Sequence, residues 1–396
     1  MPRFEPFPAV RYSPSQPLQL VIAPPYDVLS DADVDRFAAR DDHNIVVIDV
    51  PRERDGDDRY QLAGQRLNDW IAQGVLIIDK VSTFTLYRMK FVDEAGRPRA
   101  TVGVVGALEV VDEGGSGVLP HERTTPKAKS DRLDLTRATN ANLSPIWGLS
   151  LATGLSELLS EPGEHVGQYT DQEGVEHIVE RVSDPDRCGA IARAVASQPV
   201  VIADGHHRYA ISRTYRDEQR DLGSPATAAC ELTLAYIGEL VEDQLSVAAI
   251  HRLVNGITHS QLLDELERFF ELSPVGEVGA AHARQVVEQH SLCLVSADGQ
   301  GTFLKPLAYK FEGVRDLDSA RLEHALNALP AVELRYQHGV TNIVNAVRSG
   351  EAIAGVLLRP VSVEEIRRTA DERLLMPPKS TFFTPKLQTG LVIRQL

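Results

Sequence analysis

A short apolar run that passes through a glycine turn into a helix constrains the fold of this chain more than any other feature. Residues 200–203, VVIA, are apolar and mostly β-branched, which is typical of a buried strand in an α/β protein. Asp204 and Gly205 follow as a turn, and apolar residues recur with helical spacing from His206 onward. The pattern predicts a strand, a turn and a helix whose first turn holds two histidines and Arg208.

The predicted helix has two faces. Its first face carries Ala210, Ile211, Thr214 and Tyr215. Its other positions carry Arg213, Arg216, Glu218 and Arg220. We expect the first set to pack against the core and the second set to point elsewhere, because a surface helix buries only one stripe of side chains.

The first turn of this helix has the chemistry of an anion site. Backbone N–H groups are unpaired there and the helix dipole is positive, so a helix selected only for stability would carry Asp or Glu at these positions. Instead the turn offers Gly205, which allows close backbone approach, the donors or acid/base groups of His206 and His207, and the guanidinium of Arg208. The turn predicts phosphate binding. The alternative is that Asp204 only caps the helix and the histidines are a solvated pair.

Charge and composition exclude several classes of protein. The 396 residues include 41 basic and 56 acidic side chains, a net charge of −15, which disfavours general binding to nucleic acid or to an anionic membrane. No run approaches the about 18 apolar residues that span a bilayer, and we expect a cytoplasmic protein without a membrane partner. Cys188, Cys230 and Cys293 are far apart and form no CxxC motif, so they are expected in the core.

The rest of the chain alternates strand and helix patterns. We expect a strand at 44–50, a helix at 58–73, a hairpin in 83–111, a helix at 260–270 and a capping box of Ser362 and Glu365. Residues 112–145 are polar and glycine-marked, which predicts a long functional loop. The expected fold is α/β to α+β.

We expect three parts along the chain. They are an N-terminal α/β part, 1–98, a phosphate-binding core, 99–257, and a C-terminal α/β part, 258–396, that returns to the core.

Two basic segments supplement the helix turn. Within 121–137 the basic residues are Arg123, Lys127, Lys129, Arg132 and Arg137, and they outnumber three acids. Glu122 lies among these cations and is a candidate general base. The alternative is a solvated loop with ordinary surface ion pairs.

The second basic segment, 376–387, has two lysines and no acid. Lys379 and Lys386 are candidates for binding the phosphate or carboxylate of a substrate. Equally, the segment could close a sheet edge with Phe382 and Phe383 in the core.

Four stretches carry a family resemblance. APPYDVLS, PHERTTPKAKSDRLDLTRATNANLSPIWGL, ADGHHRYA and RLLMPPKSTFFTPKLQTGLV resemble, in this order, the bacterial and archaeal domain-of-unknown-function family 1015. The central region is similar to the ParB/sulfiredoxin superfamily, whose members bind nucleotides or phosphates at a helix start. That superfamily includes an ADP-dependent free-serine kinase with a comparable Asp-Gly-His-His-Arg turn, matched here by residues 204–208.

The resemblance implies a ParB/sulfiredoxin-like α/β core with additional N-terminal and C-terminal parts. Sulfiredoxin needs a cysteine where this chain has His206, so thiol repair is not expected. DNA binding, known for ParB proteins, is disfavoured by the acidic composition.

The resulting hypothesis is a nucleotide-dependent phosphotransferase, kinase-like, acting on a small hydroxyl-bearing metabolite such as free L-serine. The turn 205–208, with Arg123 and Lys127, would hold the phosphates of ADP or ATP. Asp204 would hold Mg²⁺ or orient the turn, and Glu122 would accept the acceptor's proton.

Two alternatives stay open. One is a regulatory protein of the ParB-like superfamily that binds a nucleotide without transferring phosphate. The other is a metal-dependent hydrolase with His121, Asp204, His206 and His207 as ligands, which is weaker because adjacent helix residues point about 100° apart. The oligomeric state is left open.

Overall fold

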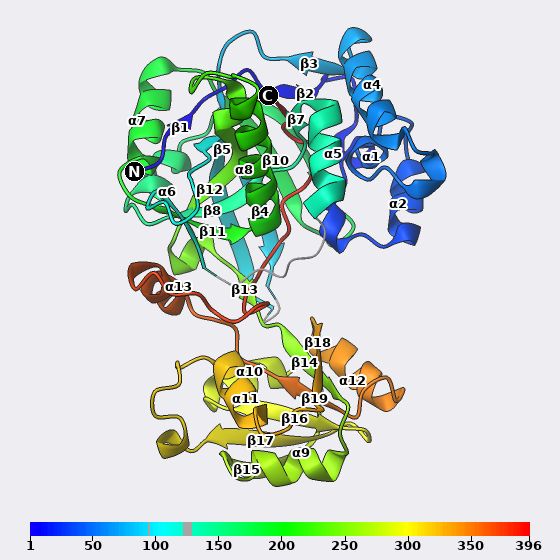
Figure 1. Ribbon diagram of the computed structural model, residues 1–396, viewed down its shortest axis with the longest axis vertical. Coiled ribbons are helices and arrows are strands. Elements are labelled where there is room, and N and C mark those ends of the chain that lie inside the picture. The colour runs from blue at the N-terminus through cyan, green and yellow to red at the C-terminus, as the bar shows by residue number, and fades with distance from the viewer. Residues whose placement is uncertain (94–95, 122–128) are drawn as a thin grey trace. The chain divides into compact units, whose positions relative to one another are not determined.

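The computed structural model describes residues 1–93, 96–121 and 129–396, with the backbone alone at 129 and 130. It divides into two compact units (Figure 1). The first comprises residues 1–92, 98–245 and 385–396, and the second comprises 93–97 and 246–384. The predicted boundary after residue 98 falls at the start of a strand in the first unit's sheet, and the predicted boundary after 257 falls within the second unit.

A mixed sheet of nine strands forms the first unit, and it confirms the predicted α/β class at this level. Its order is β6-β11-β8-β12-β5-β4-β10-β9, with β1 also paired to β5. The strands are β1 Phe4–Glu5, β4 Phe84–Val92, β5 Pro98–Glu109, β6 Val118–Pro120, β8 Ile146–Ser150, β9 Glu164–Thr170, β10 Glu176–Val182, β11 Val200–Asp204 and β12 Leu232–Glu239. β11 runs parallel to β6 and antiparallel to β8.

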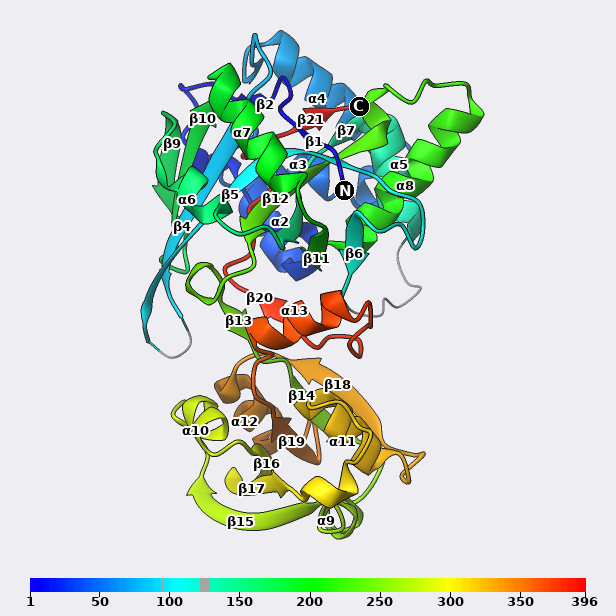
Figure 2. The same ribbon diagram turned by 90° about the vertical axis from the view of Figure 1, so that its left-hand side faces the viewer.

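One hydrophobic core joins this sheet to three helices, α6 (Leu155–Ser160), α7 (Pro185–Val195) and α8 (His206–Asp221). Alternate strand residues such as Phe84 and Leu86 lie in the same buried cluster as Leu155 of α6, Ile191 of α7 and Tyr209 of α8. Figure 2 shows α6 and α7 side by side.

Three further helices pack in succession, starting from α8. α5 (Lys129–Thr139) packs on α8, α4 (Arg59–Ala72) packs on α5, and α3 (Val46–Asp49) packs on α4. The long loop expected at 112–145 therefore contains a helix and the strands β6 and β7 (Ala141–Asn142). This unit also contains the α-helices α1 Leu18–Val21 and α2 Asp31–Ala38 and the strands β2 Val10–Tyr12, β3 Leu76–Ile78 and β21 Arg394–Gln395.

The strand predicted at 44–50 is wrong, because this segment contains the short helix α3. Asn44 explains the difference. Its side-chain oxygen accepts a hydrogen bond from the Val46 N–H, and its amide donates to the Leu20 carbonyl. A short apolar run is compatible with either a strand or a buried helix, and here the hydrogen bonds of Asn44 favour the helix.

The second unit is an antiparallel sheet in the order β15-β17-β16-β19-β14-β18. Consecutive residues of one strand lie on opposite faces of this sheet. Leu253 and Val254 belong to two different hydrophobic clusters, as do Cys293 and Leu294, so both faces of the sheet are covered. The strands are β14 His251–Asn255, β15 Phe270–Glu277, β16 Leu292–Ser296, β17 Gln300–Pro306, β18 Glu333–Gln337 and β19 Ala354–Leu357, with β13 Val247–Ala248 paired to β20 Phe382–Phe383. The helices are α9 His259–Leu266, α10 His282–Glu288, α11 Asp318–Leu326, α12 Val340–Arg348 and α13 Val363–Asp371.

Other local predictions have mixed outcomes. The helix expected at 58–73 is confirmed as α4, and all three cysteines are buried. The helix expected at 260–270 ends at Leu266, and β15 begins at Phe270. Ser362 caps α13, but the carboxylate of Glu365 pairs with Arg315 instead of completing the capping box. Within the described residues, none of the helices has the length and apolar character needed to cross a bilayer.

Candidate functional site

The site begins where two parallel strands end at the same edge of the first unit's sheet. β6 is followed by His121, and β11 is followed by Gly205 and His206. The His121 backbone N–H donates to Nε2 of His206 at 3.5 Å, and the two imidazole rings lie 5.0 Å apart. Parallel pairing therefore brings His121, the first residue of the predicted basic segment, next to the first turn of α8.

Gly205 opens α8 in a conformation that suits glycine. Its φ of +86° lies in the left-handed region, and a Cβ placed there would lie 3.1 Å from Nε of Arg208. Gly205 is the residue that begins the helix, so the alternative that Asp204 is the helix cap is wrong. The first turn contains no acidic residue, and it presents the positive end of a 16-residue helix.

Asp204 binds two cations. Lys386 Nζ donates to its Oδ1 at 2.9 Å, and Arg208 Nη2 donates to its Oδ2 at 2.7 Å. Burial acts to raise the pKa of Asp204, but Lys386 and Arg208 hold that pKa well below its ordinary value. Because each oxygen already faces a positive charge, the carboxylate does not fit the predicted role of Mg²⁺ ligand. It fits the alternative role, orientation of the turn.

Arg208 lies between Asp204 and a cavity. Its Nη1 donates to the Pro145 carbonyl, and its Nε has no hydrogen-bond partner among the described residues. The side chain is 11% exposed and lines a cavity of about 50 Å³. Burial acts to lower its pKa, but Asp204 and Asp27 outweigh burial and the pKa is raised. The guanidinium is permanently charged and faces open space.

Sequence reasoning missed the opposite wall of this cavity. Asp49 of α3 is 3% exposed and accepts a hydrogen bond from Arg132 Nη1 at 3.1 Å, while the Arg132 guanidinium lies 3.6 Å from the centre of the Tyr26 ring. Burial raises the pKa of Asp49 although Arg132 and Arg208 oppose the shift. The sequence does contain an indication of this buried carboxylate, because Asp49 lies inside the apolar run NIVVIDV.

His121 is a buried, neutral histidine. Its Nδ1 faces the Ile202 carbonyl, which can only accept, so Nδ1 carries the proton. Burial lowers the pKa of His121 to about 4, although the Ile202 carbonyl and Asp204 act in the opposite direction. At neutral pH its Nε2 is therefore an unprotonated acceptor.

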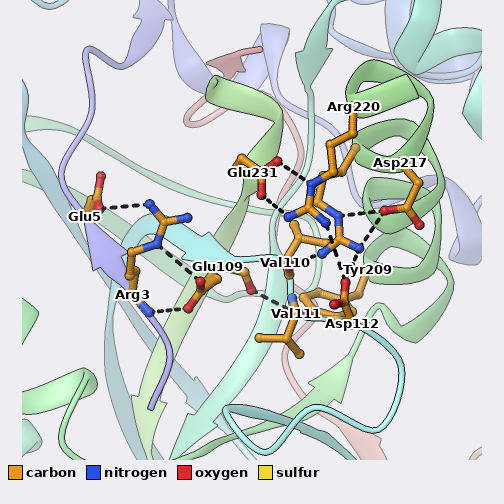
Figure 3. Close-up of polar contacts among 11 residues, drawn as sticks. Arg3, Glu5, Glu109, Val110, Val111, Asp112, Tyr209, Asp217, Arg220 and Glu231 are labelled. Atoms are coloured by element: carbon orange, nitrogen blue, oxygen red, sulfur yellow. Dashed lines mark hydrogen bonds and ion pairs between the residues drawn. The ribbon is translucent and has the colours of Figure 1, made fainter. Parts of the chain in front are cut away.

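The body of α8 is fixed by polar contacts away from its first turn (Figure 3). The Tyr209 hydroxyl donates to the Glu109 carbonyl and accepts from the Val111 N–H. Arg216, predicted to point away from the core, is 2% exposed and donates to the Val110 carbonyl, whereas Thr214, predicted to pack, is exposed. Arg220 forms a bidentate pair with Glu231. These contacts hold the helix that presents the turn.

The predicted site residues fall into three groups. The structure brings together Asp204, Gly205, His206, Arg208 and Lys386, and His207 lies in the same helical turn. Lys379 belongs to the second unit, where its carbonyl accepts from Arg252. Glu122, Arg123 and Lys127 lie outside the described residues.

Among residues 1–93, 96–121 and 129–396, no group of three or more His, Cys, Asp or Glu side chains is placed to hold a metal ion.

The stretches that carried the family resemblance meet at this site. Tyr26, Arg132 and Arg208, from the first three stretches, line the cavity, and Lys386, from the fourth, binds Asp204. Residues 4–320 match the family described as "Protein of unknown function (DUF1015)". The chain belongs to this family. No curated protein matches.

Several solved structures are similar at low identity. A mutant of free serine kinase in complex with AMP is 14% identical and covers 69% of this chain and 89% of its own, with a TM-score of 0.36. A conserved hypothetical protein from Pyrococcus furiosus is 13% identical, covers 69% and 92%, and has a TM-score of 0.35. SbnI with a C-terminal truncation, from Staphylococcus aureus, is 13% identical, covers 74% and 87%, and has a TM-score of 0.40. The ParB/sulfiredoxin-like core stays a prediction.

Proposed function

We propose that this member of the DUF1015 family binds a nucleotide at the first turn of α8 and transfers its terminal phosphoryl group to a small hydroxyl-bearing metabolite. The supporting observation is the joint placement of Arg208 and Lys386 on Asp204, beside a helix N-terminus that begins with Gly205. A helix N-terminus and fixed cations together stabilise phosphate charge. The turn 204–208 also resembles that of the ADP-dependent free-serine kinase.

In this proposal each residue has a separate task. Asp204 keeps Lys386 and Arg208 oriented before the nucleotide arrives, so little side-chain entropy is lost on binding. Gly205 lets a phosphate approach the backbone N–H groups of the turn. His206, whose Nε2 accepts from the His121 backbone N–H, would donate to a phosphate oxygen through Nδ1.

The transfer step needs one base. The acceptor's hydroxyl oxygen forms a bond to the terminal phosphorus while the bond from that phosphorus to its bridging oxygen breaks and leaves its electrons on the nucleotide. Glu122, the residue after His121, is proposed to take the hydroxyl proton. Magnesium, where it is present, would neutralise phosphate charge, and Asp204, already paired with two cations, would not be its ligand.

Binding and turnover are measured separately. Calorimetry and thermal unfolding with AMP, ADP and ATP, each with and without Mg²⁺, test binding, since a ligand of the folded state at about 100 times its Kd stabilises by about 2.7 kcal/mol. Phosphorus NMR with serine, homoserine and glycerol as acceptors tests transfer. Failure of all three nucleotides to bind overturns the proposal, and binding without any transfer identifies the regulatory alternative.

The Glu122→Gln variant tests the base. We expect it to bind nucleotide normally and to lose about 100-fold or more in turnover rate. Glu113→Gln is the control, because Glu113 is 88% exposed and pairs only with Arg213 among the described contacts. Unchanged turnover in Glu122→Gln rejects the assignment of Glu122 and leaves nucleotide binding intact.

A further inference from the structure

The cavity beside Arg208 has an unusual lining for its size. Its volume of about 50 Å³ corresponds to about four water positions, which admits a ligand group of a few non-hydrogen atoms. Three of its lining side chains, Asp49, Arg132 and Arg208, are charged and at most 11% exposed. Burial of charge around a small hollow is unfavourable unless the charges are paired or bind something.

All three of these charged groups have unused hydrogen-bonding capacity. Oδ2 of Asp49 and the Nε atoms of Arg132 and Arg208 are buried and have no hydrogen-bond partner within the described part of the chain. The carboxylate oxygen is an acceptor, and the two Nε–H groups are donors. A ligand that carries both a donor and an acceptor is complementary to all three groups, whereas a simple anion is complementary only to the arginines.

The charges around the cavity are balanced. The positive groups are Arg132, Arg208 and Lys386, which is paired with Asp204. The negative groups are Asp204, Asp27 and Asp49, all three of which act on Arg208. A ligand with one positive and one negative group leaves this balance unchanged. Free phosphate adds between one and two negative charges at neutral pH and finds only part of its charge compensated.

We propose that this cavity binds the zwitterionic head of a small α-amino acid, with the ammonium group on Asp49 and the carboxylate on Arg208 and Arg132. The ring of Tyr26 holds the Arg132 guanidinium in place by stacking. Asp49 is then the residue that selects an ammonium-bearing ligand.

The role of this amino acid as phosphoryl acceptor rests on the proposed function, whereas its binding does not. Arg208 lines the cavity and also belongs to the first turn of α8, so a hydroxyl on the side chain of the bound amino acid would lie next to the docked phosphates.

Calorimetry on the full chain tests the binding, in the absence and in the presence of ADP. The ligands are L-serine, L-homoserine, L-alanine, N-acetyl-L-serine, L-serinamide and inorganic phosphate. We expect the three free amino acids to bind, and the acetylated and amidated compounds to bind at least about 10-fold more weakly, because each lacks one charge. Equal binding of L-serine and N-acetyl-L-serine, binding of phosphate alone, or no binding of any amino acid overturns the proposal.

Two variants locate the ligand. Asp49→Asn is expected to lower the affinity for L-serine by about 10- to 100-fold. Thr136→Leu is expected to block the cavity without removing a charge, because Thr136 lines the cavity and leucine is larger. Among the described residues, the Thr136 hydroxyl bonds only to the Arg132 carbonyl of its own helix. Thr214→Leu is the control, since the exposed Thr214 makes the same helical bond, to the Ala210 carbonyl, away from the cavity. Undiminished L-serine binding in Thr136→Leu places the ligand elsewhere and rejects the site.

The outcomes separate the two proposals. Nucleotide binding without amino-acid binding rejects the cavity proposal alone. Amino-acid binding without nucleotide binding rejects the proposed function and retains the cavity as an amino-acid site.

Discussion

Lys386 Nζ donates to Oδ1 of Asp204 at 2.9 Å although the two residues are 182 positions apart in the sequence. Arg208 Nη2 donates to the other oxygen at 2.7 Å, so one carboxylate orients two cations beside the first turn of α8. Neither cation needs to be ordered when an anion arrives, because the site is preorganised. The following predictions rest on this arrangement and on the helix that carries it.

Lys386→Met is expected to lower nucleotide affinity by about 10-fold, because it removes one charged donor and leaves Asp204 paired with Arg208. Lys90→Met is the matched control: Lys90 Nζ forms an ion pair with Glu176 at 3.0 Å, on strands β4 and β10. Calorimetry with ADP on both variants and the wild type measures the effect. Equal affinities for all three would show that Lys386 does not take part in binding.

Gly205→Ala separates backbone strain from ligand binding. Gly205 and Gly154 begin α8 and α6 with φ values of +86° and +85°, so alanine costs each helix about 1 to 2 kcal/mol of strain. Only at 205 would the new Cβ lie 3.1 Å from the Arg208 guanidinium, whereas at 154 nothing lies within 4 Å. We expect similar destabilisation in both variants by urea unfolding and an about 10-fold loss of nucleotide affinity in Gly205→Ala alone. A matching loss in Gly154→Ala would point to a general effect of destabilisation.

Local sequence patterns were sufficient for the strand, turn and helix at 200–221, because apolar periodicity and glycine chemistry are both local. The same local reasoning was wrong at 44–50, where the hydrogen bonds of Asn44 decide between helix and strand. Because of that error Asp49 was missed, since a carboxylate near the end of a predicted strand has no evident reason to be buried.

Local sequence patterns do not predict which distant segments pair. Composition singled out Lys386 as a candidate for binding a phosphate or carboxylate, but its ion pair with Asp204 forms because residues 385–396 belong to the first unit. Arg216 was expected to point away from the core because charged side chains are mostly exposed, yet carbonyl and carboxylate acceptors allow its burial.

Arg216→Ala is expected to destabilise the first unit by about 2 to 3 kcal/mol. Its guanidinium is 2% exposed, and its removal leaves the buried Val110 carbonyl without this donor and opens space beside α8. Arg213→Ala on the same helix is expected to cost less than about 1 kcal/mol, because its partner Glu113 is 88% exposed. Urea unfolding followed by tryptophan fluorescence reports on this unit, since both tryptophans, Trp70 and Trp147, lie within it. Equal costs for the two variants would contradict the buried contacts of Arg216.

The buried imidazole of His121 predicts a loss of stability in mild acid. Burial lowers its folded-state pKa to about 4 from the ordinary value of 6.5, so below about pH 6.5 the unfolded state takes up the proton first. The free energy of unfolding therefore falls as pH drops from 6.5 toward 4, by up to about 3 kcal/mol.

His121→Asn keeps a donor for the Ile202 carbonyl and cannot titrate. We expect its unfolding free energy, measured by tryptophan fluorescence between about pH 7 and about pH 4.5, to depend less on pH than that of the wild type. His165→Asn, at an exposed position of β9, is expected to keep the wild-type slope, and an unchanged slope in His121→Asn would contradict the neutral, buried state of His121.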